Sequence, residues 1–227
     1  VILLGLIVIG MVAGSYWIFL GRSFYVSPLG AVAVFTLVFS ALSLLKFWWE
    51  EKRSRERTQA LALVQEVTIE TIATVTETRD PETGGHIKRT QHYVKALAEQ
   101  FKKRQRSEKI SDRWIYDLYH CAPLHDLGKV GIPDRILLKE GKLIANEFEK
   151  MKEHTVLGKK ILEAADKRLQ GNAFLHLATE IAYTHHERWD GSGYPQGLKQ
   201  QEIPLAGRMM ALADVYDALI SKRVSKQ

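Results

Sequence analysis

The chain has few residues that cross-link or interrupt a fold. Its 227 residues include one cysteine, Cys121, and six prolines. A single thiol cannot form an internal disulfide, which is typical of a chain that folds in a reducing compartment. No stretch alternates apolar and polar residues over more than a few positions, so a large β-sheet is excluded. We find no internal repeat and no low-complexity tract. These absences favour one helical domain with additional segments.

The charge pattern gives no sign of nucleic-acid binding. The formal net charge is +6, from 32 Lys and Arg against 26 Asp and Glu. The charged residues are spread over the C-terminal two-thirds of the chain, without a basic helix or a nucleic-acid-binding fingerprint. A solvated surface near anionic phospholipid explains the positive excess better than a nucleic-acid partner.

The beginning of the chain contains two long apolar runs. Residues 1–20 and 28–45 are each long enough to cross a bilayer as a helix. Two spans joined by about seven polar residues require a helical hairpin. Trp48 and Trp49 follow the second run at a position typical of lipid headgroups, and the Lys- and Arg-rich residues 50–57 place that end in the cytoplasm. We therefore predict a multi-pass protein of the cytoplasmic (inner) membrane with its catalytic domain in the cytoplasm.

A secretory signal peptide is the alternative explanation of the first run. No basic segment precedes that run, however, and the second run would be left without a role. The chain begins with Val1 and ends in the basic stretch 221–227. We therefore expect a fragment of a longer protein, truncated at both ends.

Residues 58–79 have the spacing of a helix that could pair with a second copy. Apolar and threonine side chains recur there at alternating intervals of three and four residues. The residues of this seam are Leu61, Val64, Thr68, Thr71, Val75 and Thr78. We expect either a homodimer through the seam or a simple spacer, since a threonine-rich seam makes a poor coiled coil.

Five more helices are predicted after the Pro- and Gly-containing residues 80–86. The first carries residues 93–101. The others cover residues 110–127, 146–162, 173–186 and 205–220. The part of the chain that follows the apolar runs is therefore predicted to be all-α.

Six residues bring imidazole and carboxylate groups into this part of the chain. They are His125, Asp126, His154, His185, His186 and Asp214. Adjacent His–Asp and His–His pairs are rare as structural devices, and burying unpaired polar rings costs free energy. Divalent iron, manganese, zinc or nickel bind imidazole and carboxylate ligands together. The pattern therefore predicts a metalloenzyme.

Two motifs around these residues resemble the signatures of the HD-GYP domain. The first is HDLGK at residues 125–129, and the second is HHERWDGSGYPQG at residues 185–197. The resemblance implies an HD-domain-type helical bundle (HD-GYP) at residues 71–227, C-terminally incomplete. A transmembrane hairpin at residues 1–49 and a juxtamembrane linker helix at residues 50–70 would precede it.

HD-GYP proteins are bacterial phosphodiesterases, so the resemblance implies an enzyme of second-messenger signalling. Such enzymes hydrolyse cyclic di-GMP to the linear dinucleotide pGpG and often onward to GMP. The resemblance also implies two or three divalent transition metal ions, with iron favoured and manganese as the alternative. Diguanylate cyclases, which carry GGDEF domains, are expected partners of the Gly-Tyr-Pro loop.

The resemblance assigns roles to individual residues. Asp126 would bridge two ions, and Glu82 with His86 matches the ligands that some members use for a third ion. The eight expected metal ligands are Glu82, His86, His125, Asp126, His154, His185, His186 and Asp214. The expected catalytic residues are His125, Asp126 and Lys129. Substrate contacts are expected from Lys129, Tyr194, Arg223 and Lys226.

The expected ligands predict hydrolytic chemistry. Two ions about 3.5–4 Å apart can lower the pKa of a shared water toward ~7 and supply hydroxide at cellular pH. Attack on phosphorus increases the negative charge of the diester, which the cations and Lys129 would stabilise. We expect Glu187 and Asp190 to support the ligands, and Arg208 to anchor the Tyr194 loop or Asp217.

Three alternative functions stay open. Another HD-superfamily hydrolase would act on (p)ppGpp or a deoxynucleotide, although the His–His pair and the Gly-Tyr-Pro motif argue against it. A mixed GMP–AMP ring is not distinguished from cyclic di-GMP, because no residue reads the base in a way that sequence reveals. A module that binds ligand or partner without turnover would be favoured by loss of His125, Asp126 or Lys129, but all three are present.

Overall fold

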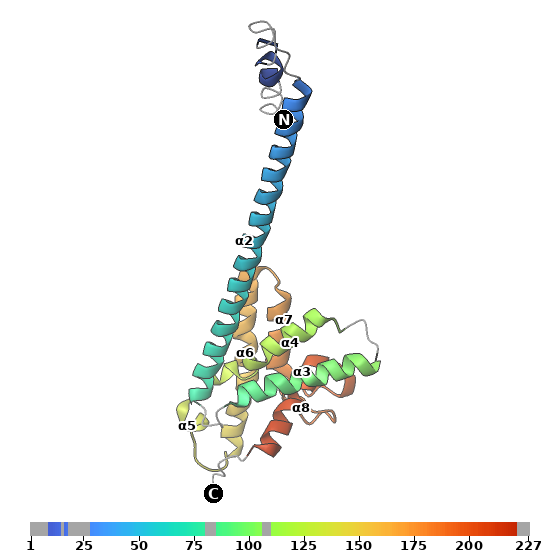
Figure 1. The fold of residues 1–227 in the computed structure, drawn as a ribbon. Helices are drawn as coiled ribbons and strands as arrows, with labels where there is room; N and C mark the ends of the chain where they lie inside the picture. Colours follow the sequence, from blue (N-terminus) through green and yellow to red (C-terminus); the bar gives the residue numbers. More distant parts are fainter. Residues whose placement is uncertain (1–8, 15, 18–27, 80–84, 106–109, 222–227) are drawn as a thin grey trace. The chain divides into compact units, whose positions relative to one another are not determined.

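The structure is a computed structural model, which describes residues 9–14, 16–17, 28–79, 85–105 and 110–221. Every regular element in these ranges is a helix, which confirms the predicted all-α fold (Figure 1). The helices with defined bounds are α2 (Pro28–Arg79), α3 (His86–Gln105), α4 (Asp112–Cys121), η1 (Ala122–Leu124), η2 (Leu127–Gly131), α5 (Asp134–Leu137), α6 (Ala145–Leu169), α7 (Ala173–Thr184), η3 (Gln200–Glu202) and α8 (Leu205–Ile220).

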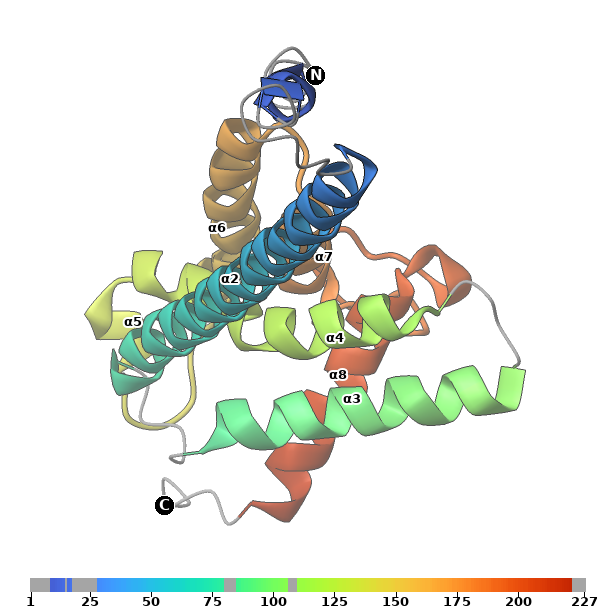
Figure 2. The same cartoon turned by 45° about the horizontal axis from the view of Figure 1, so that its top comes forward.

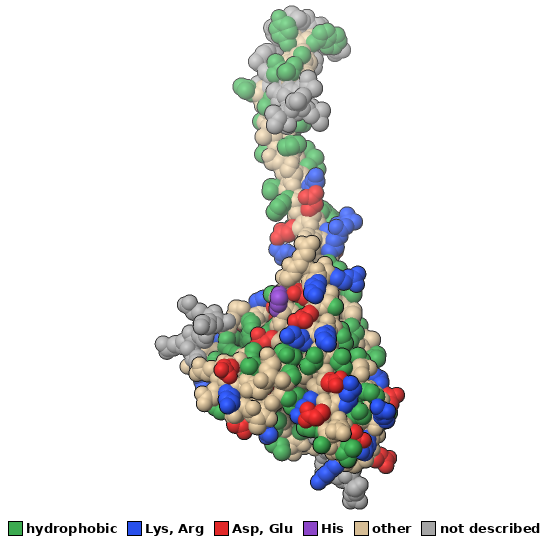
Figure 3. Space-filling model, turned by 180° about the vertical axis from the view of Figure 1, so that it is seen from behind, with side chains coloured by type: hydrophobic (Ala, Val, Ile, Leu, Met, Phe, Trp, Pro, Cys, Tyr) green, Lys and Arg blue, Asp and Glu red, His purple; other side chains and the backbone are tan. Residues whose placement is uncertain are grey.

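The chain divides into two compact units, Val1–Leu63 and Val64–Gln227. In the first unit, residues 28–63 belong to α2. Figure 3 shows hydrophobic side chains along the beginning of α2 and charged side chains after them. One stretch of this helix has a mean hydropathy of 1.8 and is long and apolar enough to cross a membrane, by length and composition alone.

The predicted membrane hairpin is only partly described. Residues 1–8, 15 and 18–27, which cover most of the first expected span and its loop, lie outside the described residues. Residues 28–45 are helical, as predicted for the second span. Within the described residues one helix passes the length and hydropathy test, so a second span has no support from the structure. The hairpin and the domain boundaries stay predictions.

The second half of α2 contacts its own unit through one narrow face. The buried positions of this face are Ile69, Ala73 and Thr76, at intervals of four and three residues. The seam predicted for pairing lies outside this face, since Val64 and Val75 are 62% and 56% exposed. Neither Pro nor Gly occurs between residues 31 and 79, which explains why α2 runs without a break.

The core of the second unit lies between α3, α4, α7 and α8. Each of these helices directs apolar side chains inward at helical spacing, and Val94, Leu118, Ile181 and Met210 are completely buried. Figure 2 shows α4 alongside α3, with α8 crossing behind them. Burial of one such side chain contributes about 1.5–3 kcal/mol. The four helices therefore form a firm support for the turns between them.

The predicted helix over residues 110–127 is wrong in its length. It ends at Cys121, and the tight turns η1 and η2 follow. Pro123 stops the helix, because proline lacks the N–H that would bond to an earlier carbonyl and its ring clashes with the preceding turn. His125 and Asp126 therefore lie at a bend between two short turns, not at the end of a regular helix.

The His–His pair also lies outside a regular helix. We predicted a helix over residues 173–186, but α7 ends at Thr184, so His185 and His186 follow its last residue. The neighbouring helix α6 is longer than the predicted residues 146–162 and runs to Leu169. Helices α6 and α7 pack extensively against each other, and this packing holds His185 and His186 beside α6.

Candidate metal centre

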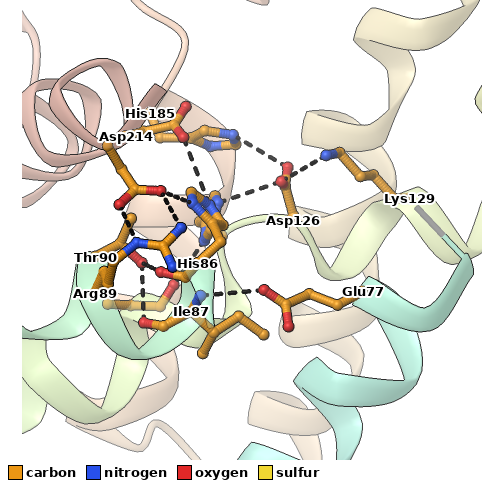
Figure 4. Close-up of polar contacts among 12 residues, drawn as sticks. Glu77, His86, Ile87, Arg89, Thr90, Asp126, Lys129, His185 and Asp214 are labelled. Atoms are coloured by element: carbon orange, nitrogen blue, oxygen red, sulfur yellow. Dashed lines mark hydrogen bonds and ion pairs between the residues drawn. The ribbon is translucent and has the colours of Figure 1, made fainter. Parts of the chain in front are cut away.

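Seven of the eight expected ligands come together in the second unit. Their donor atoms form two groups, and within each group all donor atoms lie within 4.8 Å of one another. Group 1 consists of Asp126, His154, His185 and His186, and group 2 consists of His86, His125 and Asp214. Figure 4 shows Asp126 between Lys129 and His185, with His86 and Asp214 on the other side. The eighth expected ligand, Glu82, lies outside the described residues.

Backbone carbonyls fix the orientation of three of the imidazoles. The Nδ1 atom of His125 lies 2.8 Å from the carbonyl oxygen of Ala122, that of His154 lies 2.7 Å from Met151, and that of His185 lies 3.1 Å from Ile181. A carbonyl oxygen only accepts hydrogen bonds, so each Nδ1 carries the proton. In the neutral form of each ring, Nε2 is therefore left with a lone pair, which is the form that binds a metal.

The lone pairs of group 1 converge on one point. The Nε2 atoms of His154 and His185 are 3.5 Å apart. The Oδ1 atom of Asp126 lies 3.4 Å from the first and 3.6 Å from the second. Lone pairs and a carboxylate oxygen that face one another repel unless a cation lies between them. This donor set fits a divalent transition metal.

Asp126 connects the two groups. While its Oδ1 atom faces His154, its Oδ2 atom lies 3.2 Å from Nε2 of His125. The Nε2 atoms of His86 and His125 and the Oδ1 atom of Asp126 are buried and make no hydrogen bond. Buried polar atoms without a partner are rare in folded proteins and point to an ion or water. Asp126 has the geometry of a ligand shared by two cations.

The electrostatics of the centre differ between the groups. Burial lowers the pKa of His125, but Asp126 and Asp214 outweigh it and raise this pKa to about 9. Burial, opposed by Asp126 and assisted by His185, lowers the pKa of His154 to about 4. Burial would raise the pKa of Asp126, but Lys129 and His125 hold it well below its ordinary value. Group 1 therefore contains a neutral imidazole at neutral pH, whereas His125 in group 2 holds a proton that a cation would displace.

Lys129 lies beside the bridging carboxylate. Its Nζ atom is 2.8 Å from Oδ2 of Asp126, and its side chain is 12% exposed. A cavity of about 20 Å³ adjoins Lys129, His125 and His86.

The turn η2, which contains Lys129, packs closely against α6. A Cβ atom on Gly128 would come within 1.8 Å of the carbonyl oxygen of His154. Only glycine permits this approach.

The loop that contains Tyr194 is fixed by Glu187. This buried carboxylate accepts the backbone N–H groups of Gln196 (2.7 Å) and Leu198 (3.0 Å). We predicted that Glu187 and Asp190 would support the metal ligands, but Glu187 shapes the loop instead. The exposed Asp190 accepts the N–H and the hydroxyl of Ser192 within the same loop.

Tyr194 lies against the metal centre. Its ring is 4.7 Å from the ring of His186, with an interplanar angle of 32°. Burial raises the pKa of the Tyr194 hydroxyl, so this group stays protonated at neutral pH. The other two residues expected to bind substrate, Arg223 and Lys226, lie outside the described residues.

Two residues beside Tyr194 were missed by sequence reasoning. The ring of Phe148 is 6.3 Å from that of Tyr194, and Nζ of Lys152 lies 5.0 and 5.5 Å from the two ring centres. The side chain of Phe148 is 45% exposed. One signal was available: Phe148 and Lys152 stand one helical turn apart, just before the expected ligand His154.

Arg89 takes the place that we predicted for Arg208. The Nε and NH2 atoms of Arg89 donate to the two oxygens of Asp217 at 2.6 and 2.9 Å. Burial would raise the pKa of Asp217, but hydrogen bonds from Arg89 and His86 lower it below its ordinary value. The Arg208 guanidinium lies 5.9 Å from the ring centre of Trp189, just before the Tyr194 loop, and makes no bidentate contact with Asp217.

Comparisons with known proteins agree with this architecture. A protein of Vibrio cholerae named probable cyclic di-GMP phosphodiesterase is 53% identical over 174 residues, 75% of this chain and 39% of the relative. A second V. cholerae protein, named cyclic di-GMP phosphodiesterase, is 54% identical over 175 residues, 76% of this chain and 36% of the relative. A third, named 3′3′-cGAMP-specific phosphodiesterase 2, is 44% identical over 155 residues, 68% of this chain and 27% of the relative.

The chain spans less than half the length of each of these relatives. The family match covers the whole metal centre, because the HD domain model matches residues 70–227. This chain belongs to the HD domain family.

Proposed function

We propose that this chain carries the catalytic unit of a metal-dependent phosphodiesterase that hydrolyses cyclic di-GMP. The observation that carries the proposal is the two groups of inward-facing donors that share Asp126. The relatives named for cyclic di-GMP support the substrate. When bound, a pair of divalent cations would supply Lewis acidity and lower the pKa of a shared water.

The residues of the chain prepare the centre for a phosphate diester. Asp126 turns one oxygen toward each group, so this side chain would hold both cations when they are bound. Lys129 adds a positive charge beside Oδ2 of Asp126, the oxygen that also faces His125. A fixed ammonium at this place stabilises the negative charge that grows on a phosphate as a diester bond breaks.

The Tyr194 loop and α6 supply a surface for a nucleobase. The ring of Tyr194 lies next to His186, and Phe148 and Lys152 add a second ring and an ammonium group beside Tyr194. Guanine is flat and rich in acceptors, so it can stack on an aromatic ring while its acceptors face the ammonium. We propose this surface as the base site, with Arg223 and Lys226 as further substrate contacts.

Several finer assignments belong to the same proposal. We propose an HD-GYP-type member with iron or manganese, with Glu82 as the ligand of an optional third ion. We also propose a membrane anchor in the first unit and a diguanylate cyclase partner at the Tyr194 loop. The exposed seam of α2, including Val64 and Val75, supports pairing with a second copy.

A mixed GMP–AMP ring is the second candidate substrate, because a relative named for 3′3′-cGAMP shares 44% identity with this chain. The test is metal analysis of anaerobically purified protein, followed by turnover of cyclic di-GMP, 3′3′-cGAMP and bis(p-nitrophenyl) phosphate. We expect bound divalent metal and preferential cleavage of cyclic di-GMP. Preference for 3′3′-cGAMP would reassign the substrate, and metal-loaded protein inert toward both rings would overturn the proposal.

A further inference from the structure

The imidazole of His86 is held differently from three other imidazoles of the centre. The Nδ1 atom of His86 lies 2.8 Å from Oδ2 of Asp217, a carboxylate from the other end of the domain. Both residues are buried, with 6% and 2% exposure. The Nδ1 atoms of His125, His154 and His185 instead face backbone carbonyls three or four residues earlier. His86 therefore depends on a side chain for its orientation.

Arg89 fixes the carboxylate that holds His86. Its guanidinium donates to both oxygens of Asp217, at 2.6 and 2.9 Å. A guanidinium keeps its charge and only donates, and an ionised carboxylate only accepts. The proton between His86 and Asp217 must therefore sit on Nδ1 of His86. The lone pair of His86 is then on Nε2, which lies 3.6 Å from Oδ1 of Asp214 and makes no hydrogen bond.

Helices α3 and α8 each contribute one residue to group 2 and one residue to the Arg89–Asp217 contact. On α3, His86 and Arg89 are three residues apart, and on α8, Asp214 and Asp217 are three residues apart, so each pair occupies one helix face. Figure 4 shows His86 and Asp214 near the centre, with Arg89 beside them. In each pair, the first residue supplies a donor to group 2 and the second belongs to the Arg89–Asp217 contact.

We propose that Asp217, held by Arg89, is a positioning residue that fixes the tautomer of His86 and so sets the metal affinity of group 2. This inference rests on the metal dependence of the proposed function. A carboxylate behind a ligating imidazole orients the ring and increases its basicity, and losing such a partner typically weakens metal binding by about 10–100-fold. The Nδ1 atoms of His154 and His185 face backbone carbonyls and not a carboxylate, so we expect the effect at group 2.

The test is a titration of metal-free protein with Mn²⁺, with free Mn²⁺ followed by electron paramagnetic resonance. Asp217→Asn should weaken one class of binding position by about 10–100-fold and leave the other class unchanged. Asp117→Asn is the matched control, because Asp117 is also buried and bound by an arginine, Arg113, at 3.0 Å on α4. We expect both classes of the control to match the unaltered protein.

A double-mutant comparison shows whether Asp217 acts through His86. In a His86→Ala background, Asp217→Asn should cause no further loss of Mn²⁺ affinity, since the residue that it positions is gone. A further loss of the same size would overturn the inference. Unchanged affinity in Asp217→Asn, or equal weakening of both classes in a variant that keeps its helical circular dichroism, would overturn it too.

Arg89→Gln is a second variant that keeps the carboxylate. It should weaken the same class of position by a smaller factor, and it carries the test if Asp217→Asn does not fold. The titration contains no nucleotide, so its outcome is independent of substrate. Normal Mn²⁺ affinity in these variants alongside turnover of cyclic di-GMP by the unaltered protein would overturn this inference alone. Selective weakening without any turnover would overturn the proposed substrate alone.

Discussion

The two ligand groups of the centre are built from contacts of different range. In group 1, the imidazoles of His154 and His185 are held by carbonyls of their own helices, α6 and α7. In group 2, His86 is held by a residue 131 positions later in the chain. Group 1 therefore forms once α6 and α7 are folded and packed on each other and on the turn that carries Asp126. Group 2 forms only when α3 and α8, from opposite ends of the domain, have also come together.

This difference suggests which half of the centre is the more easily altered. Local helix contacts resist small shifts, because the anchor and the ring move as one body. The contact between α3 and α8 transmits any shift of either helix directly to His86 and Asp214. We infer that group 1 is the constant half and that group 2 is the half whose metal occupancy responds to changes in packing.

The largest effect is expected from the residue that both groups share. Asp126→Ala removes the carboxylate that faces His125 on one side and His154 on the other. Both positions should lose affinity, and turnover should fall by more than the roughly 100-fold typical of losing a partner behind a ligand. Metal analysis and anaerobic turnover check this, with Asp190→Ala as an exposed control. Loss of metal from one group alone would contradict a shared ligand.

Single ligand removals should separate the groups. His154→Ala should weaken Mn²⁺ binding at group 1, and His86→Ala should weaken it at group 2, so each variant should keep normal Mn²⁺ binding at the other position. Turnover should be lost in both, since both cations are needed at the phosphate. Mn²⁺ titration distinguishes the variants. If either substitution empties both positions, the two groups bind as one unit and the comparison fails.

Sequence reasoning selected the residues of this centre but not how they are held. The candidate ligands were selected because His–Asp and His–His pairs are unusual and because the motif spacing was intact. Seven of the eight lie together in the structure, although their service as metal ligands is still a prediction. Apolar periodicity likewise indicated the helices that surround them. Both signals are local in the chain.

The missed features depend on contacts between distant segments. Nothing local marks Arg89 or Asp217 as partners, because they become neighbours only when α3 meets α8. Arg208 was expected to anchor the Tyr194 loop or Asp217, and it lies near Trp189, just before that loop. Pro123 was a local signal that we overlooked, and it should have ended the predicted helix before His125.

Two glycines offer a gentler way to disturb each half. A Cβ atom on Gly128 would lie 1.8 Å from the carbonyl oxygen of His154, and one on Gly207 would lie 2.0 Å from Oγ1 of Thr184. Overpacking of this kind costs about 1–3 kcal/mol. We expect both alanine variants to unfold at lower temperature. Gly128→Ala should weaken Mn²⁺ binding at group 1. Gly207→Ala should weaken it at group 2, because Gly207 lies on α8.

Thermal unfolding and Mn²⁺ titration check this pair of variants. Gly30→Ala is the control, because no atom lies within 4 Å of the added carbon. Its unfolding temperature should not fall, since alanine favours a helix over glycine. Equal effects of Gly128→Ala and Gly207→Ala on both groups would show that the centre responds as a whole.

The smallest expected effect is a pH dependence that differs between the groups. The raised pKa of His125, about 9, means that the metal-free ring is protonated at pH 7, so a cation must displace that proton. Mn²⁺ affinity at group 2 should therefore fall by about tenfold for each unit that the pH drops between 8.5 and 7. The lowered pKa of His154, about 4, means that this ring is already neutral throughout the same range.

The measurement is a Mn²⁺ titration at pH 7, 7.75 and 8.5. It should show one class of binding position whose affinity falls as the pH drops and one class whose affinity stays constant. Equal slopes for both classes would mean that the carboxylates around His125 do not set its protonation, and the electrostatic distinction between the groups would be lost.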